Sequence, residues 1–203
     1  MSSPSTTLDA RVRVATSPVA AAGKRLPNSV LGMIIFVAAE VMFFAALMSA
    51  HTIARATVMG GVWPPAGQPR LPVERTALNT AVLLLSGVLL FIASRRARDG
   101  YEKAIAYLAG AIATGIAFVL LQGVEWVALL REGLTMTSST HGAFLYLIVG
   151  AHALHAVVAI AALTAIYFPM RRGTLAPSTF AATQVFWYFV VLLWPVIYLR
   201  VYL

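Results

Sequence analysis

Five long apolar stretches, separated by short polar or basic segments, dominate the sequence. They run over about 28–54, 76–94, 104–130, 141–170 and 174–199. A helix rises about 1.5 Å per residue, so roughly 20 apolar residues cross the ~30 Å hydrocarbon core of a bilayer. The stretches lack the alternation of strands, and backbone polar groups in lipid must be paired within the protein. The pattern predicts an all-α membrane protein in which 28–203 form a bundle of five transmembrane helices.

The composition argues against a soluble protein. Of the 203 residues, 60% are hydrophobic and 11% are charged, and the mean hydropathy is +0.84. A soluble domain has about 25% charged residues, so soluble enzymes and nucleic-acid-binding domains are excluded despite the net charge of +8. The chain has no cysteine, which removes disulfides, thiolate metal sites and thiol nucleophiles from consideration.

The basic residues predict how the chain is oriented in the membrane. Cytoplasmic loops are enriched in Lys and Arg. The N-terminal segment and the loops after the second and fourth stretches together hold ten of these residues, and the opposite side holds five. We therefore expect a cytoplasmic N-terminus and a C-terminus outside. Residues 1–27 are expected to form a disordered cytoplasmic tail. Aromatic residues near the ends of the stretches, including Trp126, Trp194 and Tyr202, are expected at the membrane interfaces.

Ionisable and amide side chains inside the apolar stretches are the candidate functional residues. A charge at mid-bilayer costs about 3 kcal/mol on insertion scales, so such residues normally face the protein interior or a cavity. The main candidates for a proton site or a lipid cleft are Glu40, Gln122, Glu125, His152 and His155, with His51, His141 and Trp126 as secondary candidates.

Depth within the stretches indicates which of these side chains can meet. Glu40 and His152 fall near the middle, whereas Glu125, His51 and His141 fall in the outer third. We expect at least one approach of a glutamate to a histidine at one of these two levels. If the partners of Glu40 are weak, desolvation should favour its neutral form.

Each candidate also has a structural interpretation. Glu40 can join helices as a neutral hydrogen-bonding group, and Glu125 can serve packing or headgroup contacts. His152 and His155 are three residues apart, whereas helical zinc sites use a spacing of four and a third ligand, so no metal ligand is assigned. Ligation of haem by two helices would have to draw on His51 or His141.

Five short motifs occur in order along about 31–199. They are Glu40-Val-Met-Phe-Phe44, Trp63-Pro-Pro65, Leu78-Asn-Thr80, Gln122-Gly-Val-Glu-Trp126 and Gly150-Ala-His-Ala-Leu-His155. Together they resemble motifs of subunit III of the haem-copper terminal oxidases, in its short five-helix form. The last stretch departs from the family, because Tyr188 and Val191 replace a His and an Asp. Any role of that pair is therefore not carried over.

The resemblance implies a non-catalytic subunit of a cytochrome c oxidase type complex in the cell (inner) membrane, acting in aerobic electron transport. Such a chain binds no haem or copper, which belong to the catalytic subunit I. It packs beside subunit I, subunit II and further respiratory subunits, holds phospholipid in a cleft, and supports proton uptake and the stability of the catalytic subunit. Three alternatives stay open: a subunit-III-like protein of a nitric oxide reductase, a small proton or cation transporter, and an intramembrane metalloenzyme using His152 and His155.

Overall fold

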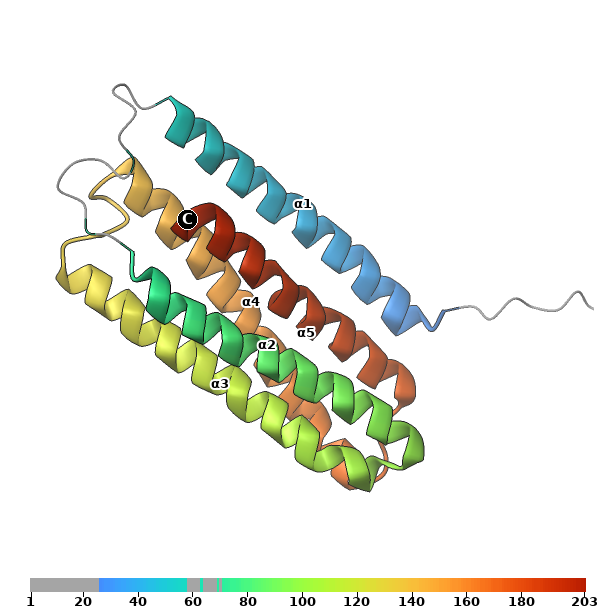
Figure 1. The fold of residues 1–203 in the computed structure, drawn as a ribbon. Coiled ribbons are helices and arrows are strands. Elements are labelled where there is room, and N and C mark those ends of the chain that lie inside the picture. The colour runs from blue at the N-terminus through green and yellow to red at the C-terminus, as the bar shows by residue number, and fades with distance from the viewer. Residues whose placement is uncertain (1–25, 58–62, 64–68, 70) are drawn as a thin grey trace, which may run out of the picture.

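The bundle contains five long helices. The computed structural model describes residues 26–57, 63, 69 and 71–203, and its helices are α1 (Asn28–Ala56), α2 (Val73–Arg96), α3 (Tyr101–Arg131), α4 (Thr140–Arg171) and α5 (Pro177–Ile197) (Figure 1). All five are long and apolar enough to cross a membrane, and the described ranges contain no strand. The predicted all-helical bundle is confirmed. The tail expected over 1–27 lies outside the described residues, apart from its last two.

Local sequence signals set the ends of the last two helices. The hydroxyl of Ser139 accepts a hydrogen bond from the backbone N–H of Gly142 at 3.0 Å, which caps the start of α4. After α4 the chain turns at Gly173, whose φ of +69° costs glycine little. Helix α5 starts at Pro177. Proline suits the first turn of a helix, because the backbone N–H that it lacks would have no partner within the helix there. The fifth helix therefore begins three residues later than the apolar stretch suggested.

Helix α5 lies inside the bundle and α1 lies at its side (Figure 1). Helix α2 packs along α3, α3 packs along α4, and α5 contacts α1, α2 and α4. Of the five helices, α5 is the most buried and α1 the least. The core that they enclose includes the fully buried rings of Phe44, Trp187 and Trp194. Because α1 has few neighbours within the chain, each polar contact that it makes has a large share in fixing its position.

Two aromatic residues expected at the interfaces lie inside the bundle. Trp194 has no exposed surface, and its indole N–H donates to the hydroxyl of Thr80 at 2.9 Å. Tyr202 is buried in a π-helical turn (Tyr198–Tyr202) that follows Pro195. The interfacial placement of Trp194 and Tyr202 was wrong, because partners on α2 and α3 draw their polar atoms inward.

Small residues on neighbouring helices make room for the side chains of α5. A Cβ atom on Gly87 of α2 would come within 2.9 Å of Cγ1 of Val191, and one on Gly115 of α3 would come within 2.8 Å of the indole of Trp187. Glycine lets membrane helices approach closely in this way. Val191, one of the two residues that depart from the family motif, is therefore accommodated as part of an apolar contact.

Replacing Gly142 by alanine should destabilise the chain by roughly 1–3 kcal/mol, the usual range for overpacking. An added Cβ would overlap the backbone carbonyl oxygen of Thr135, which cannot rotate away as a side chain could. Thermal unfolding in detergent, followed by circular dichroism, measures the loss. Gly32→Ala is the control, since a Cβ there meets nothing within 4 Å. Equal stability of the two variants would contradict the packing at the start of α4.

Candidate functional site

The candidate residues do not share one site. They form an ion pair between α1 and α4, a hydrogen-bonded network among α2, α3 and the C-terminal turn, and a histidine that faces a cavity. Two secondary candidates meet a tryptophan near the end of α1. Each place is described in turn, because each allows different chemistry.

The Glu40–His155 pair joins α1 to α4. Oε2 of Glu40 lies 3.1 Å from Nε2 of His155, and the two side chains are 20% and 15% exposed. The rings of Phe44, Phe186 and Phe189 lie around the imidazole, with centroids 5.4 to 6.4 Å from its own. The predicted approach of a glutamate to a histidine is confirmed. The partner is His155, one helical turn from the His152 that matched Glu40 in depth.

The hydrogen bonds of His155 determine how many protons the pair can hold. Nδ1 lies 2.7 Å from the backbone carbonyl oxygen of Ala151. A carbonyl only accepts, so Nδ1 carries a proton. The contact between Nε2 and Glu40 then requires one further proton, which is either on the carboxyl group or on the imidazole. Both arrangements have no net charge, which suits the aromatic surroundings. A neutral Glu40, expected from the sequence if its partners are weak, corresponds to the first of these arrangements and stays a prediction.

The Glu125 network (Thr76, Asn79, Gln122, Glu125 and Tyr202) joins α2, α3 and the C-terminal turn. Oε1 of Glu125 accepts from Nδ2 of Asn79 at 3.0 Å. Oε2 accepts from the Thr76 hydroxyl at 2.9 Å and from Nε2 of Gln122 at 3.2 Å. Glu125 is only 6% exposed, so these three donors offset the cost of removing its carboxyl group from water.

Three members of this network were not predicted from the sequence. Thr76 and Asn79 lie three residues apart on one face at the start of α2, at the depth of Glu125, and that spacing was a signal that could have found them. Tyr202 gave no such signal. Its hydroxyl reaches Nε2 of Gln122 at 3.2 Å only because the last residues form a π-helical turn.

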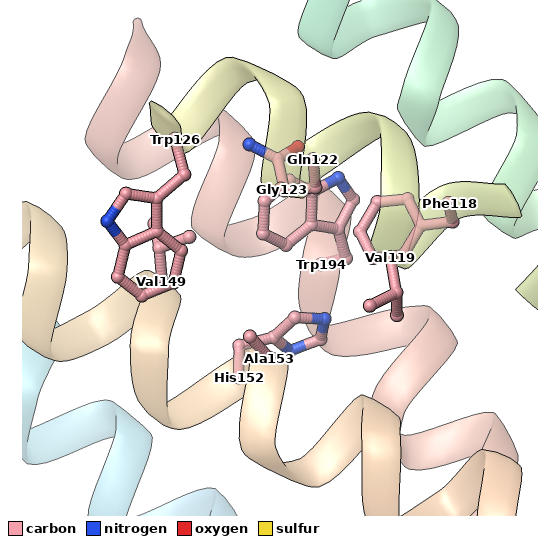
Figure 2. Close-up of a pocket in the computed structure, with 9 residues that line it drawn as sticks. All are labelled: Phe118, Val119, Gln122, Gly123, Trp126, Val149, His152, Ala153 and Trp194. Atoms are coloured by element: carbon pink, nitrogen blue, oxygen red, sulfur yellow. The ribbon is translucent and has the colours of Figure 1, made fainter. Parts of the chain in front are cut away.

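His152 stands apart from both clusters. Its ring is 1% exposed and lies against Trp194, with centroids 5.0 Å apart and planes at 35°. Neither ring nitrogen has a hydrogen-bond partner among the described residues. Figure 2 shows the ring beside a cavity of about 200 Å³ whose wall includes residues of α3, α4 and α5. Trp126, a secondary candidate, forms another part of this wall and packs on Tyr146 at 5.2 Å.

The remaining secondary candidates lie together near the end of α1. The buried rings of His51 and His141 both contact the indole of Trp63 edge to face, at 5.6 and 5.2 Å between centroids. Within the described ranges, no three His, Cys, Asp or Glu side chains come close enough together to hold a metal ion. His51, His141 and Trp63 therefore form an aromatic cluster that joins the end of α1 to the start of α4.

Five helices that are long and apolar enough to span a membrane define a multi-pass membrane protein. The family model "Cytochrome c oxidase subunit III" matches residues 24–203. The chain is 33% identical to cytochrome c oxidase subunit 3 of Oryctolagus cuniculus, 32% to that of Dasypus novemcinctus and 31% to that of Gallus gallus. Each match extends over 179 residues and covers 84% of this chain and 67% of the relative. The chain belongs to the cytochrome c oxidase subunit III family. It is a non-catalytic subunit of an oxidoreductase complex. Family membership favours the oxidase subunit over an independent transporter or a metalloenzyme.

Replacing Asn79 by leucine should lower the free energy of unfolding by about 1–3 kcal/mol, because Oε1 of Glu125 would lose its donor while remaining buried. Leucine is similar in size, so little packing is lost. Leu78→Ala is the control, since Leu78 is exposed on the surface of the bundle and such changes usually stay within about 0.5 kcal/mol. Unfolding of the solubilised chain measures both. If Asn79→Leu is as stable as the control, the network contributes no stability.

Proposed function

We propose that this chain packs beside the catalytic haem-copper subunit of a cytochrome c oxidase type complex in the cell (inner) membrane, and that the Glu40–His155 pair supports proton uptake during sustained turnover. Haem and copper belong to the partner subunits. Family membership supports the complex. The observation that carries the role in proton uptake is the 3.1 Å contact between Glu40 on α1 and His155 on α4.

The chemistry of the pair suits proton exchange. The proton can move between carboxyl and imidazole without changing the net charge, so the move avoids creating an isolated charge in a low-dielectric region. The side chains of Glu40 and His155 keep some exposure at the surface of the bundle. A neighbouring subunit or a water molecule can therefore reach them from outside this chain.

The groove between α1 and α5 supports the binding of phospholipid. It encloses about 530 Å³ and is lined by Ala45, Met48, Ser49, Thr52, Ile53, Val196 and Arg200. Its wall is mostly apolar, as an acyl chain requires, and Arg200 offers a positive charge to a lipid phosphate at the end of α5. Arg200 was not among the residues expected to line a lipid cleft.

The other candidates are assigned a positioning role within this function. Gln122 and Glu125 hold α3 against α2 through the Glu125 network. His51 and His141 hold the ends of α1 and α4 against Trp63. The contacts of His51 and His141 with Trp63 keep α1 and α4 in the register that brings His155 to Glu40.

Replacing Glu40 by glutamine tests the proposed role of the pair. The amide can donate to Nε2 of His155 and keep the helices together, but it cannot release a proton. We expect the variant to assemble with the haem-containing partner and to start at the wild-type rate. The number of turnovers completed before activity is lost, and proton uptake during them, should fall several-fold.

The matched control is Glu102→Gln, which removes a carboxyl group exposed at the start of α3 and outside the pair. Oxygen consumption and proton uptake of the reconstituted complexes are recorded until activity ceases. Sustained turnover of Glu40→Gln equal to that of the wild type and of Glu102→Gln would rule out a proton-handling role. The pair would then act only as a structural contact.

A further inference from the structure

A pocket between the end of α2 and the start of α5 is not used by the function proposed above. It holds about 320 Å³, and it lies at the opposite end of α5 from Arg200 and the groove beside α1. Its wall includes Arg98, in the 3₁₀ turn after α2 (Ala97–Asp99), and Gln184, which lies seven residues after Pro177 in α5. Seven helical residues rise about 10 Å. This α2–α5 pocket therefore extends from the helix ends into the membrane-spanning part of the bundle.

The α2–α5 pocket opens at a strongly basic end of the bundle. Figure 1 shows that the ends of α2 and α4 and the starts of α3 and α5 lie at this end. The two connections there, over 95–103 and 171–177, hold two acidic residues, Asp99 and Glu102, and six exposed basic residues. The basic residues are Arg95, Arg96, Arg98, Lys103, Arg171 and Arg172. Such an excess of positive charge at a membrane surface attracts anionic lipid headgroups.

Arg98 is the basic residue of this end that lines the α2–α5 pocket. Its side chain has no hydrogen bond or ion pair among the described residues, although Asp99 and Glu102 are close in sequence. Arg95, in contrast, lies over the ring of Phe91 at 5.1 Å from its centroid. The guanidinium group of Arg98 is therefore free to contact a ligand in the pocket.

The other polar side chains of the described wall have no donor to offer. The hydroxyl groups of Ser94 and Tyr101 donate to backbone carbonyl oxygens at 2.9 and 3.0 Å. Nε2 of Gln184 is fully buried, so a molecule in the pocket cannot reach it. A ligand must therefore be recognised through the positive charge of Arg98, and this requirement selects an anion.

We propose that the α2–α5 pocket binds the headgroup of an anionic phospholipid, with the lipid phosphate at Arg98. Arginine binds phosphate oxygens through charge-assisted hydrogen bonds. Pro177, Phe180 and Ala181 supply apolar wall farther along the pocket, which suits the glycerol group and the first methylene groups of the acyl chains. A zwitterionic headgroup carries its own positive charge, which the surrounding basic residues repel, so an anionic headgroup is preferred.

Two other anions fit the pocket less well. A free phosphate ion can neutralise Arg98, but it leaves the apolar wall at Phe180 and Ala181 uncovered. An acidic segment of a neighbouring subunit would bring backbone N–H and C=O groups into the membrane-spanning part of the bundle. These groups require partners there, and the side chains of the described wall provide few.

The test uses phosphatidylglycerol that carries a diazirine near the start of one acyl chain. The purified complex containing this chain is placed in phosphatidylcholine nanodiscs with a small fraction of this probe, irradiated, and analysed by peptide mass spectrometry. We expect saturable labelling of peptides that contain residues 94–101 or 177–184. Unlabelled phosphatidylglycerol should compete, whereas phosphatidylethanolamine at the same fraction and inorganic phosphate in the buffer should not. Labelling of residues 45–53 or 196–200 would report the separate groove beside α1.

Two variants that remove the same charge test the role of Arg98. Arg98→Gln removes the charge that lines the pocket and should raise the half-saturating fraction of probe about tenfold or more. Arg96→Gln removes a charge at the end of α2 that is absent from the wall. It should change the half-saturating fraction by less than about threefold, because salt screens a charge that the phosphate does not touch.

A second pair of variants tests the position of the site. Ala181→Phe places a ring in the pocket and should also weaken labelling about tenfold or more. Thr179→Phe adds a ring at an exposed residue outside the wall and should stay within about twofold of the wild type. The ratio of haem to chain verifies the assembly of each variant.

Three outcomes would overturn the proposal. The first is labelling of the wild-type chain that does not saturate, or that phosphatidylethanolamine or inorganic phosphate suppresses as well as phosphatidylglycerol does. The second is an equal loss of labelling in Arg98→Gln and Arg96→Gln, which would show a general attraction to the basic end. The third is saturable labelling that Ala181→Phe leaves unchanged. None of these outcomes bears on the Glu40–His155 pair, so the proposed role in proton uptake is tested separately.

Discussion

A polar side chain inside a membrane-spanning bundle is costly to leave without a partner in the protein, because the hydrocarbon core offers none. The Glu125 network meets this requirement by bringing three neutral donors to one buried carboxyl group. In doing so it holds α2 against α3 and draws the C-terminal turn inward. The Glu40–His155 pair meets the same requirement with one shared proton. Together these groups join α2 to α3 and to the C-terminal turn, and α1 to α4.

Helix α1 shows most clearly how structure and function are connected. It is the least buried of the five helices. Its residue Glu40 forms an ion pair with His155 and so connects α1 to α4 by a polar contact. An unpaired carboxylate or an unpaired imidazolium would be costly in these apolar surroundings. One shared proton avoids that cost and, in the proposed function, supplies the proton that the pair exchanges. In the proposed function, the Glu40–His155 pair thus both stabilises the subunit and takes part in proton uptake.

The five helices and the buried ionisable residues could be predicted from the sequence, but not all of the contacts that these residues make. An apolar stretch of about 20 residues or more can pair its own backbone groups in lipid by forming a helix. The five helices could therefore be predicted from the lengths of the stretches. Depth comparison also correctly predicted a contact between a glutamate and a histidine. It could not choose between His152 and His155, because this choice depends on the rotation of α4, which is set by packing. The inward position of Tyr202 depends on a π-helical turn, for which no hydrophobic pattern exists.

The most direct test of this account is a double-mutant cycle between Glu40 and His155, read as the free energy of unfolding of the solubilised chain. Glu40→Leu or His155→Leu alone leaves a polar group unpaired, and each should cost about 1–3 kcal/mol. The double variant leaves none, so we predict that it is at least as stable as either single variant, with a coupling of about 1 kcal/mol or more. Losses that add to within about 0.5 kcal/mol would show that the two side chains do not depend on one another and would contradict the account.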